Sequence, residues 1–292
     1  MDIIRFLPYM TAKIKLGGIN LKLRYLLILF GILVPVAIVA RVFQLTGTDP
    51  TTGFFKAEAV AANNAIMTGF LGVSLLLVVL GRISKSYPKR IHSPSVPMAA
   101  ASFVMSAGVF TYFGVTLFTL TSITPMDMLY AFLTVGSAVY FIWQGLAYLG
   151  YLHFSTILTA FPVLAAALRL GITFVRFNGI SSIAENLIDV IMMSVVLLFW
   201  LFHGRMFSDI GFRKSAKWVY GTGLAASLIS LAGMGPRFFV YFFYGSNKLH
   251  ETTIPYFIDV LTAVYIVIFL ASTYQSLKSK RIADENEGLL IL

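Results

Sequence analysis

Eight long apolar runs, separated by short polar or charged segments, dominate the pattern of the chain. They cover residues 25–45, 59–80, 97–120, 126–147, 153–175, 182–203, 216–236 and 254–275. Each run is long enough for a helix to cross a hydrocarbon layer of about 30 Å. The runs lack the alternation of barrel strands, and a bilayer interior offers no partner for open backbone groups, so each run predicts a helix. The pattern therefore predicts an all-α integral membrane protein with eight transmembrane helices.

Composition and charge support this class. Hydrophobic residues make up 58% of the 292 residues and charged residues 12%, and the mean hydropathy is +0.85, which excludes a soluble globular chain. The formal net charge of +10 does not indicate nucleic acid, because the basic residues lie in short segments between the apolar runs. We expect the lipid bilayer as a partner and no nucleic acid.

Lys and Arg residues are distributed unequally between the two sides of the predicted bundle. Sixteen of the 22 lie in residues 1–24, in the loops after the second and sixth runs, at the start of the seventh run (Lys217), or after the eighth run. Cytoplasmic loops of membrane proteins carry such an excess of Lys and Arg. We therefore expect a multi-pass protein of the cell membrane with both termini in the cytoplasm.

The two halves of the chain share short sequence matches in a fixed order. The segment PVAIVAR at 35–41 aligns with PVLAAALR at 162–169, Asn63 aligns with Asn186, and the Gly-Arg pair at 81–82 aligns with the one at 204–205. Because each half contains four predicted helices, both copies enter the membrane from the same side. The matches predict a parallel 4+4 internal repeat about a two-fold axis along the membrane normal.

This repeat divides the chain into four segments. They are a basic cytoplasmic N-terminal segment (1–24), a first transmembrane repeat (25–148), a second repeat (149–277) and a cytoplasmic tail (278–292). The third helix of each repeat, 97–120 and 216–236, is rich in small residues, which let helices approach closely in lipid. We expect these two helices to pack most closely in the bundle.

Charged side chains within the apolar runs indicate a candidate site. Arg169 and Asp189 lie on consecutive predicted helices, and a rise of 1.5 Å per residue places both roughly 8–10 Å below the outer boundary. A lone charge at that depth costs several kcal/mol, so we expect these two residues to form an ion pair. The charges gather on the outer side, which predicts a polar site there with the candidate substrate-binding residues Arg169, Arg176, Glu185, Asp189, Arg41, Asn63 and Asn186.

Some of the charges also have a purely structural explanation. Arg41, Arg176 and Arg237 lie close enough to the predicted boundary to extend into lipid headgroups. Asp127 and Asp259 occupy the first turns of predicted helices, where a carboxylate complements the helix dipole. For these five residues the structural interpretation is favoured over a role in a site.

Catalytic and cofactor motifs are absent from the sequence. It contains no GxSxG, HExxH or GxxxxGK pattern, no cysteine, and no two of its four histidines on one predicted helix. Neither a metal nor another cofactor is expected, and an enzyme is not the leading hypothesis.

Three functions are compatible with these features. The leading hypothesis is a transporter-like permease for a small polar or charged solute, bound at the outward-facing polar site. The first alternative is a membrane scaffold or signalling subunit that binds lipid, partner helices or a second copy of itself, and the second is a membrane-embedded enzyme acting on a lipid-linked substrate. A permease requires a polar path to the cytoplasmic side, and below Asn63 and Asn186 the sequence offers little except hydroxyl groups.

Overall fold

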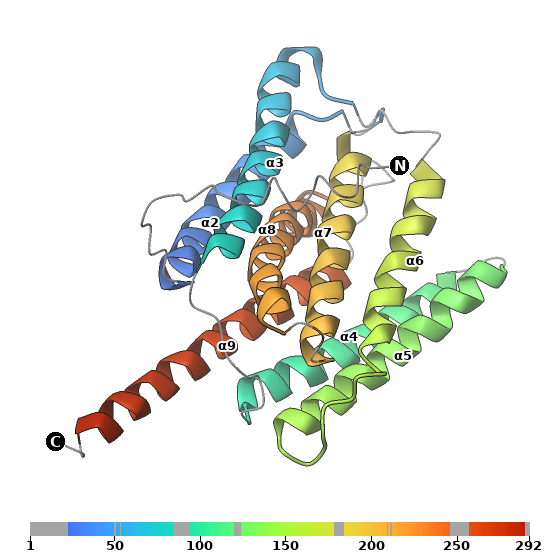
Figure 1. The fold of residues 1–292 in the computed structure, drawn as a ribbon. Coiled ribbons are helices and arrows are strands. Elements are labelled where there is room, and N and C mark those ends of the chain that lie inside the picture. Colours follow the sequence, from blue (N-terminus) through green and yellow to red (C-terminus); the bar gives the residue numbers. More distant parts are fainter. Residues whose placement is uncertain are drawn as a thin grey trace, which may run out of the picture.

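The computed structural model describes residues 23–49, 51–52, 54–84, 94–119, 124–177, 184–208, 210, 212–245 and 257–289. These residues form helices and no named strand. In chain order the elements are α2 (Leu23–Thr46), the 3₁₀ turn η1 (Ala57–Ala59), α3 (Val60–Ile83), α4 (Val96–Thr119), α5 (Pro125–Tyr148), α6 (Ala160–Phe177), α7 (Ala184–Phe207), α8 (Phe212–Tyr244) and α9 (Phe257–Leu289). Figure 1 shows them gathered into one bundle.

Seven of the described helices are long and apolar enough to cross a membrane, and α6 is the shorter exception. At 1.5 Å per residue, the 18 residues of α6 extend over about 27 Å, close to the hydrocarbon thickness of about 30 Å. The prediction of an all-α polytopic membrane protein is confirmed. Eight spans require that α6 also crosses.

Helix boundaries follow the apolar runs closely in the first half of the chain and depart from them in the second. α6 begins at Ala160 rather than 153, because residues 156–159 form turns and the Ala160 N–H donates to the Ile157 carbonyl at 3.1 Å. α8 continues to Tyr244, beyond the predicted end at 236. α9 continues to Leu289, so most of the predicted tail 278–292 is helical. The predicted N-terminal segment lies, except for its last two residues, outside the described residues.

α8 is the central helix of the described bundle. It packs against α2, α3, α7 and α9, and 78% of its membrane-crossing window is buried. Figure 1 shows α8 between the α2–α3 pair and α7. The expectation of close packing for 216–236 is therefore confirmed.

Two glycines bring α3 and α8 into backbone contact. A Cβ added to Gly81 would lie 2.3 Å from the Gly221 Cα, and one added to Gly221 would lie 2.6 Å from the Val78 carbonyl oxygen. No larger side chain fits there without moving a helix. Small residues thus stabilise this interface by close van der Waals contact rather than by displacing water.

α4 occupies a less central position than predicted. It packs against α5 and α9, and only 33% of its membrane-crossing window is buried, because its other face is exposed. Figure 1 shows α4 and α5 side by side. Under the predicted two-fold axis, α4 is equivalent to α8 and α7 is equivalent to α3, so the contact between α8 and α3 should have a counterpart between α4 and α7. The main contacts of α7 are instead with α6 and α8. The helix packing does not show the 4+4 repeat, which stays a prediction.

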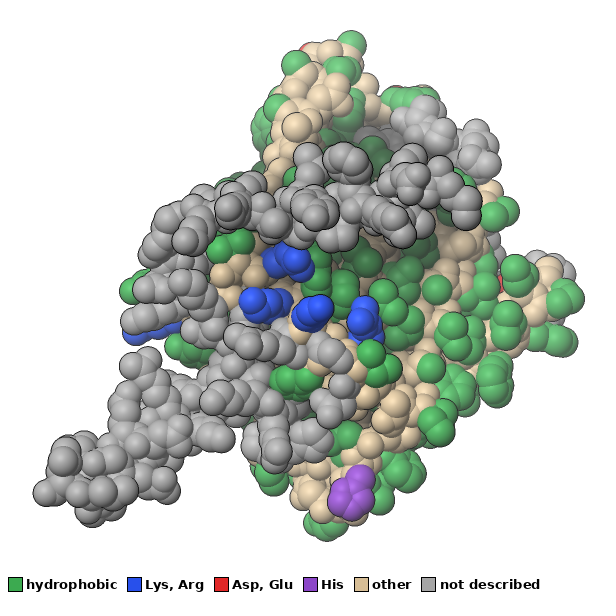
Figure 2. Space-filling view, in the orientation of Figure 1, with side chains coloured by type: hydrophobic (Ala, Val, Ile, Leu, Met, Phe, Trp, Pro, Cys, Tyr) green, Lys and Arg blue, Asp and Glu red, His purple; other side chains and the backbone are tan. Residues whose placement is uncertain are grey.

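Figure 2 shows several Lys and Arg side chains close together on the face turned to the viewer. The Arg82 guanidinium at the end of α3 lies 4.5 Å from the centre of the Trp218 ring near the start of α8. This cation–π contact joins two helix ends that were both predicted to be cytoplasmic. The clustering agrees with the unequal distribution of Lys and Arg in the sequence, and the assignment of this end to the cytoplasm stays a prediction.

Candidate functional site

A cavity lies between α4, α5, α6, α7 and α9. Tyr112, Tyr130 and Asp259 line its outer part. Phe141 and Trp200 form its deepest part, roughly 24 Å along α5 and α7 from the first residues of those helices. The cavity therefore extends past the middle of the bundle.

An ion pair lies in the wall of this cavity. Arg169 on α6 donates from Nη1 to Asp259 Oδ1 at 2.5 Å and from Nη2 to Asp259 Oδ2 at 2.8 Å. The guanidinium also lies 5.8 Å from the centre of the Tyr112 ring. The Arg169 side chain is 18% exposed and that of Asp259 is 5% exposed. A bidentate pair of this kind fixes both the charge and the orientation of its two side chains.

Asp259 was predicted to complement a helix dipole, and Asp189 was predicted as the partner of Arg169. The second assignment was wrong: Arg169 pairs with Asp259, and Asp189 Oδ1 lies 2.8 Å from Nη1 of Arg237 on α8. Asp259 lies in the first turn of α9, as predicted, and its carboxylate also pairs with Arg169. The predicted depths of 8–10 Å were close to those observed. Arg169 lies about 12 Å from the outer end of α6, and Asp189 lies about 8 Å from the outer end of α7. Depth along a helix does not determine which way a side chain points around the axis, and that direction selected the partners.

Arg41 belongs to a separate polar cluster between α2 and α3. Its Nη1 donates to Gln44 Oε1, and Gln44 Nε2 donates to the Asn63 carbonyl oxygen at 3.3 Å. Arg41, Gln44, Asn63 and Arg237 are each 0% exposed. The prediction that Arg41 and Arg237 extend into headgroups was therefore wrong, because neighbouring helices enclose both side chains.

The remaining predicted site residues lie on α6 and α7. Asn186 is buried on α7, one turn before Asp189. Arg176 and Glu185 fall within α6 and α7, and their side chains lie outside the described residues. The structure thus distributes the candidate residues over several places, and of those with described side chains Arg169 is the one that lines the large cavity.

Asp127 has the structural role that the sequence predicted. Its Oδ2 accepts hydrogen bonds from the Thr124 N–H at 3.0 Å and from the Thr124 hydroxyl at 2.6 Å, while the Asp127 N–H donates to Thr124 Oγ1. This reciprocal capping box begins α5.

Polar side chains follow one stripe of α5 from the cavity toward the opposite end of the bundle. Thr134 and Ser137 line the cavity, and Gln144 and Tyr148 follow beyond Phe141 on the same side of the helix. All four are at most 5% exposed. Their spacing of three, seven and four residues keeps them on one helical face. The stripe extends the polar lining to the last residue of α5, which the sequence analysis had not anticipated.

Below the cavity, this stripe meets a histidine enclosed by aromatic rings. The Tyr265 hydroxyl on α9 donates to Gln144 Oε1 at 2.7 Å and lies 3.4 Å from His203 Nε2 on α7. Ring centres within 5.5 Å of the imidazole belong to Phe199, Trp200, Phe207 and Phe269. Gln144 Nε2 and the Tyr140 and Tyr148 hydroxyls are buried without a hydrogen-bond partner among the described protein atoms. These groups can therefore bond to water or to a passing polar solute.

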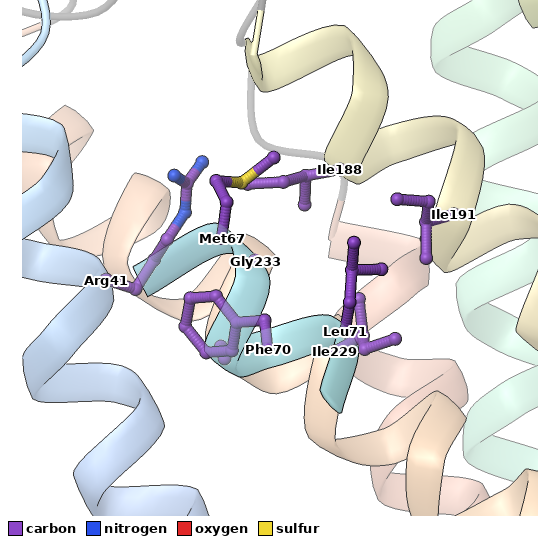
Figure 3. A pocket seen from close by; sticks show the side chains of 9 residues that line it. Arg41, Met67, Phe70, Leu71, Ile188, Ile191, Ile229 and Gly233 are labelled. Carbon is purple, nitrogen blue, oxygen red and sulfur yellow. The ribbon is translucent and has the colours of Figure 1, made fainter. Parts of the chain in front are cut away.

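A second, smaller pocket differs in chemistry. It lies between α2, α3, α7 and α8, and Figure 3 shows Arg41 at one side of it, with apolar side chains such as Leu71, Ile191 and Ile229 clustered at the other. Arg41 is the charged side chain in its described lining. An apolar pocket of this kind suits hydrocarbon better than a hydrated solute.

The residues that sequence analysis missed share one property: each was counted as part of an apolar run or a boundary. Tyr112, Tyr130 and Trp200 were counted as ordinary apolar positions, and only the spacing of three, seven and four residues between the polar residues of 134–148 could have revealed the stripe. Comparison of the chain with models of known protein families, with curated proteins and with solved structures finds no match.

Proposed function

We propose that this protein is a permease for a small polar or charged solute, with its binding site in the cavity beside the Arg169–Asp259 pair. The observation that carries the proposal is the continuity of polar side chains. The cavity reaches from the outer ends of α5 and α9 to Phe141 and Trp200, and the α5 stripe continues through Gln144 to Tyr148. A hydrated solute needs such partners along its path, because bilayer hydrocarbon provides none.

Phe141 and Trp200 would act as the barrier of this path. Their rings lie 5.5 Å apart, centre to centre, between the cavity and the Gln144–Tyr265–His203 cluster. A movement of α5 relative to α7 that separates these two rings would join the cavity to the lower polar groups. A permease requires one such barrier in each state, so that the two sides are never open together.

The second pocket favours one alternative, a lipid-binding scaffold. Its described lining is apolar except for Arg41, a composition that suits an acyl chain with an anionic headgroup. This pocket does not account for the buried polar stripe of α5, whereas a permease does.

Flux measurements with the reconstituted full-length protein test the proposal. Proteoliposomes would be loaded with labelled anionic, cationic, zwitterionic or neutral polar solutes, and efflux would be compared with that of protein-free vesicles. We expect saturable efflux for one class, and slower efflux when Gln144 is replaced by Leu. Ser230→Ala is the matched control, because Ser230 is equally buried but lies on α8, which does not line the cavity. Efflux equal to that of protein-free vesicles for all four classes would reject a permease.

A further inference from the structure

The charges of the cavity constrain the class of solute that it can bind. Among its described lining residues, the charged side chains are Arg169 and Asp259, whose charges cancel. A ligand with one net charge would bring an uncompensated charge into a space of low dielectric constant, at a high cost in free energy. A zwitterion brings none. Its anionic group can bind the guanidinium while its cationic group binds the carboxylate, so that each charge keeps an opposite neighbour.

The geometry of the pair suits this exchange. Arg169 is the more exposed partner, at 18% against 5% for Asp259, so an anionic group from the cavity meets the guanidinium first. A planar guanidinium binds a carboxylate in a bidentate manner, as Arg169 already does with Asp259. The cationic group of the same small ligand would then reach Asp259, whose oxygens can accept further hydrogen bonds.

The deeper part of the cavity selects the remainder of the ligand. Phe141, Met192, Met193, Val196 and Trp200 line it with aromatic rings, thioethers and a branched aliphatic side chain. Such surfaces favour an apolar substituent, above all an aromatic ring that can pack against Trp200. A hydrophilic substituent would lose its hydration here without full replacement.

We propose that the cavity binds a small zwitterion with an apolar substituent, such as a free α-amino acid with an aromatic or branched aliphatic side chain. This inference rests on the proposed role of the cavity as a solute site, and it does not require that the solute is transported. It names the class by the chemistry of the cavity: one anionic and one cationic group close together, next to an apolar group.

Binding measurements with matched ligands test this class. The full-length protein in lipid nanodiscs would be titrated by calorimetry with L-phenylalanine, with phenethylamine, which lacks the carboxylate, and with 3-phenylpropanoate, which lacks the amine. Each missing charged contact should weaken binding about tenfold or more. Equal binding of either singly charged analogue, or no binding of phenylalanine to the folded protein, would overturn the proposal.

Paired variants separate the cavity from the rest of the protein. The double variant Arg169→Leu with Asp259→Leu should lose the preference for phenylalanine over its singly charged analogues. The double variant Arg237→Leu with Asp189→Leu is the matched control, because this buried pair does not line the cavity, and it should keep the preference. Loss of the preference in the control alone would overturn the assignment of the site.

Two further comparisons distinguish the source of the ligand and the failure of either proposal. A zwitterionic lipid headgroup has the same chemistry as the proposed ligand. If the ligand is a free solute, titrations in nanodiscs with and without phosphatidylethanolamine should give the same affinity for phenylalanine. A lower affinity in the presence of this lipid would reject the assignment of the site to a free solute. Phenylalanine that binds but does not cross proteoliposomes would leave the ligand class intact and reject the permease. Transport of a singly charged solute would leave the permease intact and reject the zwitterionic ligand class.

Discussion

The pairing of Asp189 with Arg237 gives a quantitative prediction about stability. Replacing Asp189 by Asn removes the negative charge 2.8 Å from a guanidinium whose side chain is 0% exposed. Removing one partner of a buried pair typically costs about 3–5 kcal/mol, because the remaining charge stays buried without that counter-charge. We expect a loss of that size, and we expect the double variant Arg237→Leu with Asp189→Leu to recover most of it, since no charge is then left behind.

Combinations of variants identify which residues are partners. Arg169→Leu with Asp259→Leu should compensate in the same way, whereas Arg169→Leu with Asp189→Leu should be close to additive, because each change leaves a different partner charged. The free energy of unfolding would be measured by reversible denaturation in mixed micelles. Stronger coupling between Arg169 and Asp189 than within the two observed pairs would refute the assignment of partners.

Three other predictions follow from single contacts. Gly221→Val should destabilise the bundle by roughly 2 kcal/mol or more, as measured by thermal unfolding, because its Cβ would lie 2.6 Å from a backbone oxygen of α3; wild-type stability would contradict that contact. Tyr265→Phe should cost about 1–3 kcal/mol, because Gln144 then loses its hydroxyl donor; an unchanged unfolding temperature would exclude this hydrogen bond. Hydrogen bonds from Thr51 lower the pKa of Asp49. The stabilisation that they provide is therefore present above the ordinary pKa of 3.8 and is lost as the pH falls through the lowered value. Thr51→Val should raise the pKa of Asp49, as followed by NMR titration of the carboxylate.

The positions of the spanning helices could be predicted from sequence because the bilayer imposes one length on every apolar run. The first four boundaries agree within a few residues for this reason. α8 and α9 extend further because an apolar-run criterion detects the hydrocarbon segment, while a helix can continue beyond it into aromatic or charged residues. The small residues of 216–236 also marked the central helix, since close packing in lipid depends on small side chains.

The arrangement of the site could not be predicted in the same way. The sequence gives the depth of Arg169 and Asp189 along their helices, but the direction of each side chain depends on how the helices rotate and pack. Asp259 and Arg237 were assigned to boundaries, although the packing of α8 and α9 against their neighbours encloses both. Tertiary contacts, which a single sequence does not specify, thus determined the partners of Arg169 and Asp189.

The most direct test of the account is the accessibility of one cavity position from both sides of the membrane. The chain contains no cysteine, so Ser137→Cys introduces a single thiol in the cavity wall, and Ser230→Cys places the matched control thiol in the buried face of α8. Membrane-impermeant methanethiosulfonate would be added to right-side-out and to inside-out vesicles. A permease with a continuous polar path predicts that the thiol at 137 reacts from either face, and much faster than the thiol at 230. Reaction from one face only, or at the rate of the control, would contradict it.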